Sequence, residues 1–96
     1  MRPSEALALH RNELRDLVRQ FDVARPRIFG SVLTGMDTEN SDLDLLVDRG
    51  RATSLFTLAG LELKAEELLG VRVSVLTPGF LSPRFRDDVL RRAEPL

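Results

Sequence analysis

Two aspartates separated by a single residue, Asp42 and Asp44, are the side chains in this sequence best suited to metal chemistry. Segment 42–48 begins with polar and apolar residues in alternation, which is typical of a β-strand, so both carboxylates should lie on one face about 7 Å apart. Two like charges this close repel each other unless a cation lies between them, and Mg²⁺ prefers such oxygen ligands. An exposed strand with two solvated acids would show the same spacing, but the apolar residues that follow indicate a buried strand and favour the magnesium site.

Gly30 and Ser31 are the second candidate element. They follow the short apolar run 27–29 and open a predicted helical turn. Glycine lets the backbone approach a ligand closely, and a helix N-terminus offers free N–H groups that suit phosphate. The alternative is a plain turn in which Ser31 caps the helix. A phosphate cradle after one strand and a carboxylate pair on the next are together what nucleotidyl transfer requires.

Helices and strands that alternate along the chain must position these residues. Hydrophobic periodicity and breaker residues predict helices over 4–21, 53–69 and 83–93, a helical turn over 31–35, a loop over 36–41, and strands over 27–29, 42–48 and 71–76. Ser4 should cap the first helix, and Gly70 should end the second. In the last helix we expect Phe85, Val89 and Leu90 to face the core. This order predicts an α/β (α+β) fold with a small mixed sheet of about three strands flanked by helices.

Length and composition limit the class of protein. The 96 residues are 43% hydrophobic and 30% charged, which suits a soluble chain forming one domain over residues 1–96. The net charge of -1 and the lack of Tyr and Trp argue against direct nucleic-acid binding. No cysteine is present, so disulfides and thiolate metal sites are excluded. Because no apolar run reaches the length of a membrane span and the start lacks a signal-peptide pattern, we expect a cytoplasmic protein without a membrane partner.

The spacing of the candidate residues resembles that of a known family. Gly30-Ser31, ten intervening residues and then Asp42-Leu43-Asp44 match the Gly-Ser-x10-Asp-x-Asp signature of the polymerase-β-like nucleotidyltransferase superfamily. The wider stretch 27–47 resembles the minimal nucleotidyltransferase (MNT) branch, whose members are often antitoxins paired with a HEPN-domain toxin, typically a ribonuclease encoded beside them. The resemblance implies the nucleotidyltransferase fold and transfer of AMP from ATP to a tyrosine hydroxyl of the toxin. It also implies that Gly30 and Ser31 hold the ATP phosphates, and that Asp42 and Asp44 are catalytic ligands of Mg²⁺.

Two positions depart from the family pattern. The superfamily usually has a third carboxylate on the following strand, and Ser74 occupies that position here. Serine is no general base near pH 7 without an activating partner, and general-base help is typically worth about 10²–10⁴ in rate. Thr34 stands where family members often carry a basic residue. The role of that basic residue could pass to one of three arginines whose positions the sequence does not reveal, Arg25, Arg27 or Arg72.

Asp48 is a further acid with the same parity as the carboxylate pair Asp42 and Asp44. In an extended strand it lies roughly 13 Å beyond Asp44, which is too far to complete the same metal site. We therefore expect a solvated acid at the strand end rather than a replacement for the missing carboxylate.

The sequence thus leaves two main hypotheses. In the first, the protein is a Mg²⁺-dependent protein adenylyltransferase that silences its toxin. In the second, loss of the third acid leaves a nucleotidyltransferase-fold module that neutralises its partner by steric contact, or that only binds nucleotide. Transfer to a small molecule such as an aminoglycoside is disfavoured, because such enzymes usually carry an additional substrate domain.

Overall fold

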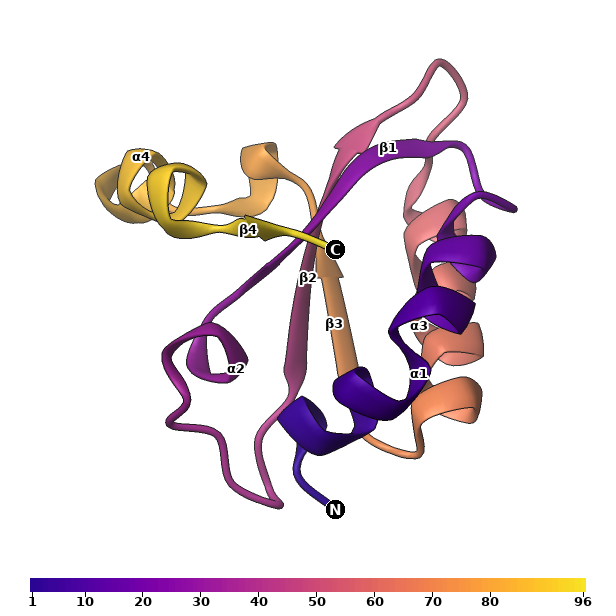
Figure 1. The fold of residues 1–96 in the computed structure, drawn as a ribbon. Helices are drawn as coiled ribbons and strands as arrows, with labels where there is room; N and C mark the ends of the chain where they lie inside the picture. Colours follow the sequence, from indigo (N-terminus) through magenta and orange to yellow (C-terminus); the bar gives the residue numbers. More distant parts are fainter.

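A computed structural model describes residues 1–96 as helices packed around one four-stranded sheet (Figure 1). The helices are α1 (Pro3–Val18), α2 (Ser31–Thr34), α3 (Leu55–Leu69) and α4 (Pro83–Arg92), with a short 3-10 turn, η1, at Pro78–Phe80. The strands are β1 (Val23–Phe29), β2 (Leu43–Arg49), β3 (Val73–Leu76) and β4 (Glu94–Pro95). The sheet order is β3-β2-β1-β4, with β2 and β3 parallel and β1 antiparallel to both of its neighbours.

The mixed α/β fold class predicted from the sequence is confirmed. The sheet has one strand more than expected, because the two-residue strand β4 pairs with Arg27 and Ile28 of β1. A pairing this short leaves no hydrophobic alternation in the sequence from which a strand could be predicted. β1 also begins at Val23, four residues earlier than the run 27–29, since its first half is irregular around Arg25 and Pro26.

The alternation of β2 gives the sheet two different faces. Leu43, Leu45 and Val47 point to one face and are fully buried. They pack with one apolar cluster drawn mainly from α1, α3 and β3, whose largest side chains include Leu14, Leu58 and Leu61. Truncation of such a buried leucine to alanine typically costs about 2–5 kcal/mol. This layer therefore fixes β2, and with it the carboxylates on the opposite face.

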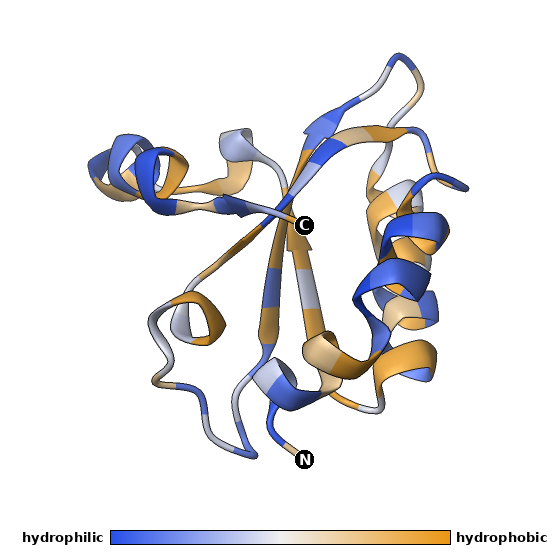
Figure 2. Ribbon diagram, viewed as in Figure 1, coloured by the Kyte–Doolittle hydropathy of each residue, from blue (hydrophilic) through white to orange (hydrophobic).

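The helices divide unequally between these two faces. α1 and α3 lie side by side over the buried face, whereas α2 and α4 stand on the other side of the sheet, near its two ends (Figure 1). The hydropathy colouring shows apolar residues concentrated on the strands and α3, while most of α4 and the turn between β2 and α3 are hydrophilic (Figure 2). The second face of the sheet is therefore the more accessible one. None of the helices has the length and apolar character needed to cross a membrane.

The ends of the two long helices have distinct causes. Ser54 caps α3 by accepting a hydrogen bond from Thr57 N, and Gly70 ends it with a left-handed φ of 70°, as expected for a C-terminal glycine. The predicted cap of α1 is wrong, because the helix begins at Pro3 and already contains Ser4. Ser4 N instead donates to the carboxylate of Asp37, 33 residues further along the chain, at 2.8 Å.

The expectation that α4 turns Phe85, Val89 and Leu90 into the core is wrong. No residue of α4 is buried, and the side chains of Phe85 and Leu90 are 61% and 39% exposed. The periodicity identifies an apolar helix face, but the core is already filled by α1 and α3 on the opposite side of the sheet. α4 is attached instead through the Arg86 guanidinium, which donates to the carbonyls of Pro78 (2.8 Å) and Leu81 (3.0 Å).

Candidate active site

The turn between β1 and α2 brings Gly30 directly against Asp44. Gly30 has a φ of 77°, a conformation that L side chains rarely adopt. A Cβ placed on Gly30 would overlap the Asp44 Oδ2 atom. Two separate features therefore require glycine here, and the second shows that the two predicted elements meet in the structure.

Asp44 is a half-buried acid that no basic side chain of the chain contacts. It lies on the accessible face of β2, opposite Phe29 of β1 and beside Ser74 of β3. Its carboxylate forms no hydrogen bond or ion pair within the chain. Burial raises the pKa of the Asp44 carboxyl, and repulsion from Asp42 raises it further. Both effects would be relieved by a cation bound at this carboxylate.

Asp42 immediately precedes β2 and has a single charged partner, Arg72. The Arg72 Nε atom lies 3.0 Å from Asp42 Oδ1. The alignment is not that of a hydrogen bond, so this buried oxygen accepts none. Arg72 Nη2 also donates to the carbonyl of Asn40 at 2.8 Å. Of the three arginines left open by the sequence, Arg72 is the one that the structure places beside the carboxylate pair.

Arg25 and Arg27 lie at the opposite end of β2, where both pair with Asp48. Arg27 Nη2 lies 3.0 Å from Asp48 Oδ1, and Arg25 pairs with Oδ2. Hydrogen bonding by Arg27, supported by Arg25, holds the pKa of the Asp48 carboxyl below its usual range. Asp48 is only 20% exposed, so it is a paired, largely covered acid rather than the solvated one that we expected. Sequence spacing could not show this, because both arginines belong to another strand.

Ser31 begins α2 with a hydroxyl that makes no hydrogen bond within the chain, while its carbonyl accepts from Met36 N at 3.0 Å. The loop that continues to Asp42 is fixed by Asp37, which is 5% exposed and accepts the hydrogen bond from Ser4 N. This backbone hydrogen bond lowers the pKa of the Asp37 carboxyl. Sequence analysis missed Asp37, because nothing local distinguishes it from the other polar residues of the loop.

The donor set fits a divalent cation. The carboxylate pair supplies oxygen ligands, one of them a buried oxygen without a hydrogen bond, and the missing side chain at Gly30 leaves backbone close to Asp44. Mg²⁺ typically uses one or two carboxylates together with substrate phosphates, so two acids suffice for a site completed by a nucleotide. No group of three or more His, Cys, Asp or Glu side chains is arranged to hold a metal. Ser74, the residue at the position where the family resemblance implies a third acid, is aligned with Asp44 on the neighbouring strand.

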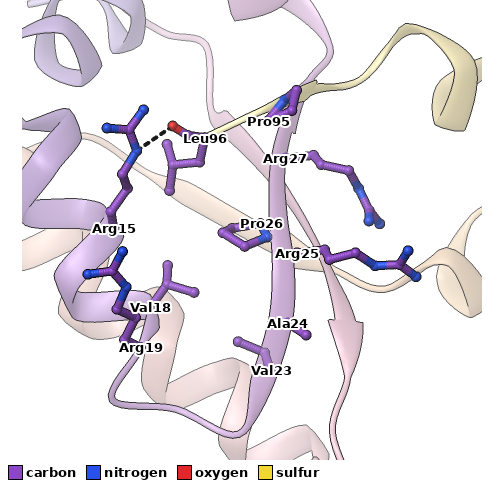
Figure 3. Close-up of a pocket in the computed structure, with 10 residues that line it drawn as sticks. All are labelled: Arg15, Val18, Arg19, Val23, Ala24, Arg25, Pro26, Arg27, Pro95 and Leu96. Carbon is purple, nitrogen blue, oxygen red and sulfur yellow. Dashed lines mark hydrogen bonds between the residues drawn. The ribbon is translucent and has the colours of Figure 1, made fainter.

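One small cavity adjoins this site, whereas the largest cavity of the molecule does not. A small one of about 220 Å³ adjoins Gly30 between α2 and α4, and includes Phe29, Thr34 and Arg92 in its lining. The largest, of about 580 Å³, lies elsewhere, between the end of α1 and β1 (Figure 3). There the Arg15 Nε atom donates to the Leu96 carbonyl at 2.6 Å, while Arg25 and Arg27 point away to the other side of β1. The largest cavity therefore does not contain the carboxylate pair.

Comparison with known proteins identifies the family of this chain. Residues 7–95 match the nucleotidyltransferase domain family, and the chain belongs to that family. It is 38% identical over 85 residues to the protein adenylyltransferase MntA of Thermococcus cleftensis, covering 88% of this chain and 83% of that protein.

Solved structures show the same fold. One, described as a candidate minimal nucleotidyltransferase, is 43% identical with a TM-score of 0.85, covering 97% of this chain and 95% of that one. A more distant match, 18% identical with a TM-score of 0.68, covers 92% of this chain and 69% of the other. It is the complex of a tri-AMPylated Shewanella oneidensis HEPN toxin with its MNT antitoxin, and at this identity it shows a shared fold alone.

Proposed function

We propose that this protein, as one minimal domain over residues 1–96, is the antitoxin of a HEPN/MNT-type pair and transfers AMP from ATP to a tyrosine hydroxyl of its toxin. The main structural support is the contact between Gly30 and Asp44, which joins the turn that we propose to bind phosphate to the carboxylate pair. The similarity to a protein adenylyltransferase and the fold shared with an MNT antitoxin support the substrate and the partner.

In this proposal Asp42 and Asp44 would hold Mg²⁺, which when bound supplies positive charge to the phosphates and the leaving group. The free Ser31 hydroxyl and the first N–H groups of α2 would hold phosphate oxygens, since these donors have no partner inside the helix. Gly30 allows phosphate to approach Asp44 without a clash. The acceptor oxygen would attack the α-phosphorus of ATP, and pyrophosphate would leave as the bond to the bridging oxygen breaks.

The missing third acid limits the rate that we expect. Ser74 cannot take the proton of the acceptor hydroxyl, so that proton would pass to water or to a group of the partner. An antitoxin that modifies its toxin once has no need of fast turnover. This sequence contains no tyrosine, so a tyrosine acceptor would have to belong to another chain.

Ser74 also supports the second candidate, a catalytically degenerate module. In that case the fold and the carboxylate pair would remain, but the protein would neutralise its partner by contact or would only bind nucleotide. The two candidates differ in whether the toxin acquires mass.

The deciding experiment measures the intact mass of a HEPN-type toxin encoded beside this gene, co-expressed with the wild-type protein or with the double variant Asp42→Asn/Asp44→Asn. Transfer predicts a gain of one or more AMP units with the wild type and none with the double variant. Asp48→Asn serves as the matched control, because it removes an acid from the same strand outside the pair. An unmodified toxin in a stable complex with the wild-type protein would reject transfer in favour of the binding module.

A further inference from the structure

Arg72 lies directly beside the first carboxylate of the pair. The Arg72 carbonyl accepts a hydrogen bond from Leu43 N at 2.9 Å, and the parallel register of β2 and β3 continues from Leu43 and Val73 to place Asp42 opposite Arg72. From there the guanidinium reaches both Asp42 and the Asn40 carbonyl. Opposite charges facing each other across neighbouring strands attract. Within the chain, the positive charge beside Asp42 is therefore supplied by Arg72.

The ion pair between Arg72 and Asp42 is open to solvent. The side chains of Arg72 and Asp42 are 70% and 44% exposed, so only the contacting Asp42 Oδ1 atom is covered, and the approach to that atom lacks the alignment of a hydrogen bond. Pairs this exposed contribute at most about fivefold to an equilibrium constant. A divalent cation can displace such a partner, because it carries twice the charge and can bind both carboxylates at once.

The released guanidinium would remain close to any bound nucleotide. The backbone of Arg72 is fixed by its hydrogen bond to Leu43, so only the exposed side chain has to move. Its planar set of donors suits phosphate oxygens. Thr34 leaves α2 without a basic residue, and Arg25 and Arg27 are engaged by Asp48.

We propose that Arg72 is an exchangeable cation: it neutralises Asp42 before any ligand binds and passes to the nucleotide phosphates when a divalent cation takes its place. This inference rests on the proposed function, since it assumes that the carboxylate pair binds a metal–nucleotide complex. It assigns Arg72 two partners in succession. Removal of the side chain should therefore change the affinities for the divalent cation and for the nucleotide in opposite directions.

The test is calorimetric titration of the purified chain without toxin, using Mn²⁺ alone and then Mn²⁺ with AMP-PNP. Arg72→Ala should bind Mn²⁺ alone about two- to fivefold more tightly than wild type, because the competing internal cation is gone. It should bind AMP-PNP in the presence of Mn²⁺ about tenfold more weakly, because a charged contact to phosphate is lost. The control is Arg51→Ala, which removes an exposed arginine without ion pairs from the opposite end of β2 and should match wild type with both ligands.

A purely structural role for Arg72 would weaken the binding of both ligands together, and that result would overturn the exchange. Unchanged binding of both ligands would overturn it too, as would a lack of Mn²⁺ binding in every variant. If Arg72→Ala folds poorly, Arg72→Gln removes the charge while retaining a donor for the Asn40 carbonyl, and the same opposite shifts are expected. Neither titration requires AMP transfer. Opposite shifts with an unmodified toxin would therefore support the exchange and count against the proposed transfer alone.

Discussion

The two ends of β2 carry acids of the same type and the same parity in opposite electrostatic settings. At one end, Asp44 is half-buried without contact to a basic side chain, and its pKa is raised by burial and by Asp42. At the other end, Asp48 is covered by Arg27 and Arg25, and its pKa is lowered. The alternation of the strand places both acids on the same face, so the difference comes mainly from the arginines of β1 at one end, with Asp42 adding to it at the other.

This difference separates an acid that stabilises the fold from one that is available to a ligand. The charge of Asp48 is already neutralised by partners within the chain, so it has little to gain from an external cation. Asp44 is held in an unfavourable setting that a bound cation would relieve. Acids with raised pKa values beside a close backbone approach are frequent at functional sites. The variants below test whether the two ends of β2 have these different roles.

The largest effect is expected when the acid at each end of β2 is replaced separately by asparagine. Asp44→Asn should lower AMP transfer to the toxin by about 10³-fold, because loss of a metal ligand removes several kcal/mol of charge stabilisation. Asp48→Asn should leave transfer within about threefold of wild type, since a single charge change outside the site has a small effect on rate. Rates of toxin modification, followed by mass spectrometry, measure both. Equal losses in the two variants would refute the functional division of β2.

A gain of function should follow from restoring an acid next to Asp44. Ser74→Asp should raise the transfer rate by about 10²-fold, the lower end of general-base catalysis, because residue 74 is aligned with Asp44 on the neighbouring strand. The metal-free variant should melt at a lower temperature owing to repulsion from Asp44, and Mg²⁺ should reverse that loss. Ser74→Asn provides an uncharged control of similar size. A comparable gain in this control would exclude general-base catalysis as its cause.

Two glycines offer a matched test of the contact with Asp44. Gly30 and Gly35 have nearly the same φ, 77° and 74°, but a Cβ at Gly35 would meet nothing within 4 Å. Alanine at Gly35 should cost about 1–2 kcal/mol in unfolding free energy for the left-handed backbone, and alanine at Gly30, whose ψ of -151° lies in a region almost restricted to glycine, should cost at least as much. Gly30→Ala should also reduce AMP transfer at least about tenfold beyond Gly35→Ala, because it displaces the Asp44 carboxylate. Similar transfer rates in the two variants would show that the close approach at Gly30 has no functional role.

The smallest effect concerns the stability supplied by Asp48. Asp48→Asn should lower the free energy of unfolding at pH 7 by about 1 kcal/mol or slightly more, because the pair with Arg27 is largely covered whereas the pair with Arg25 is exposed and adds little. Because the folded pKa of Asp48 is lowered, its contribution is fully present above the unfolded carboxyl pKa of about 3.9 and disappears as pH falls through the folded value. Urea denaturation at pH 7 and at pH 3 should therefore show a difference between wild type and variant that shrinks in acid. A difference that persists unchanged at pH 3 would have another cause.

Much of the architecture could be predicted from local sequence patterns. The alternation in β2 indicates which residues share a face, and the apolar periodicity identified α1, α3 and α4 within a few residues of their observed ends. These signals are reliable because side-chain direction in helices and strands depends on the backbone of a few adjacent residues. The same argument placed Asp42 and Asp44 together, although it gave no information on their charged neighbours.

The sequence by itself determined the spacing of Gly30, Ser31 and the carboxylate pair, the family to which the chain belongs, and the absence of an acid at Ser74. Only the tertiary structure decided which arginine lies beside Asp42, that Asp37 fixes the loop through Ser4, and that α4 remains outside the core. The physical reason is that charge pairing and burial depend on contacts between residues far apart in the chain. A periodic pattern shows which face of an element is apolar, but the packing of the other elements decides whether that face is covered.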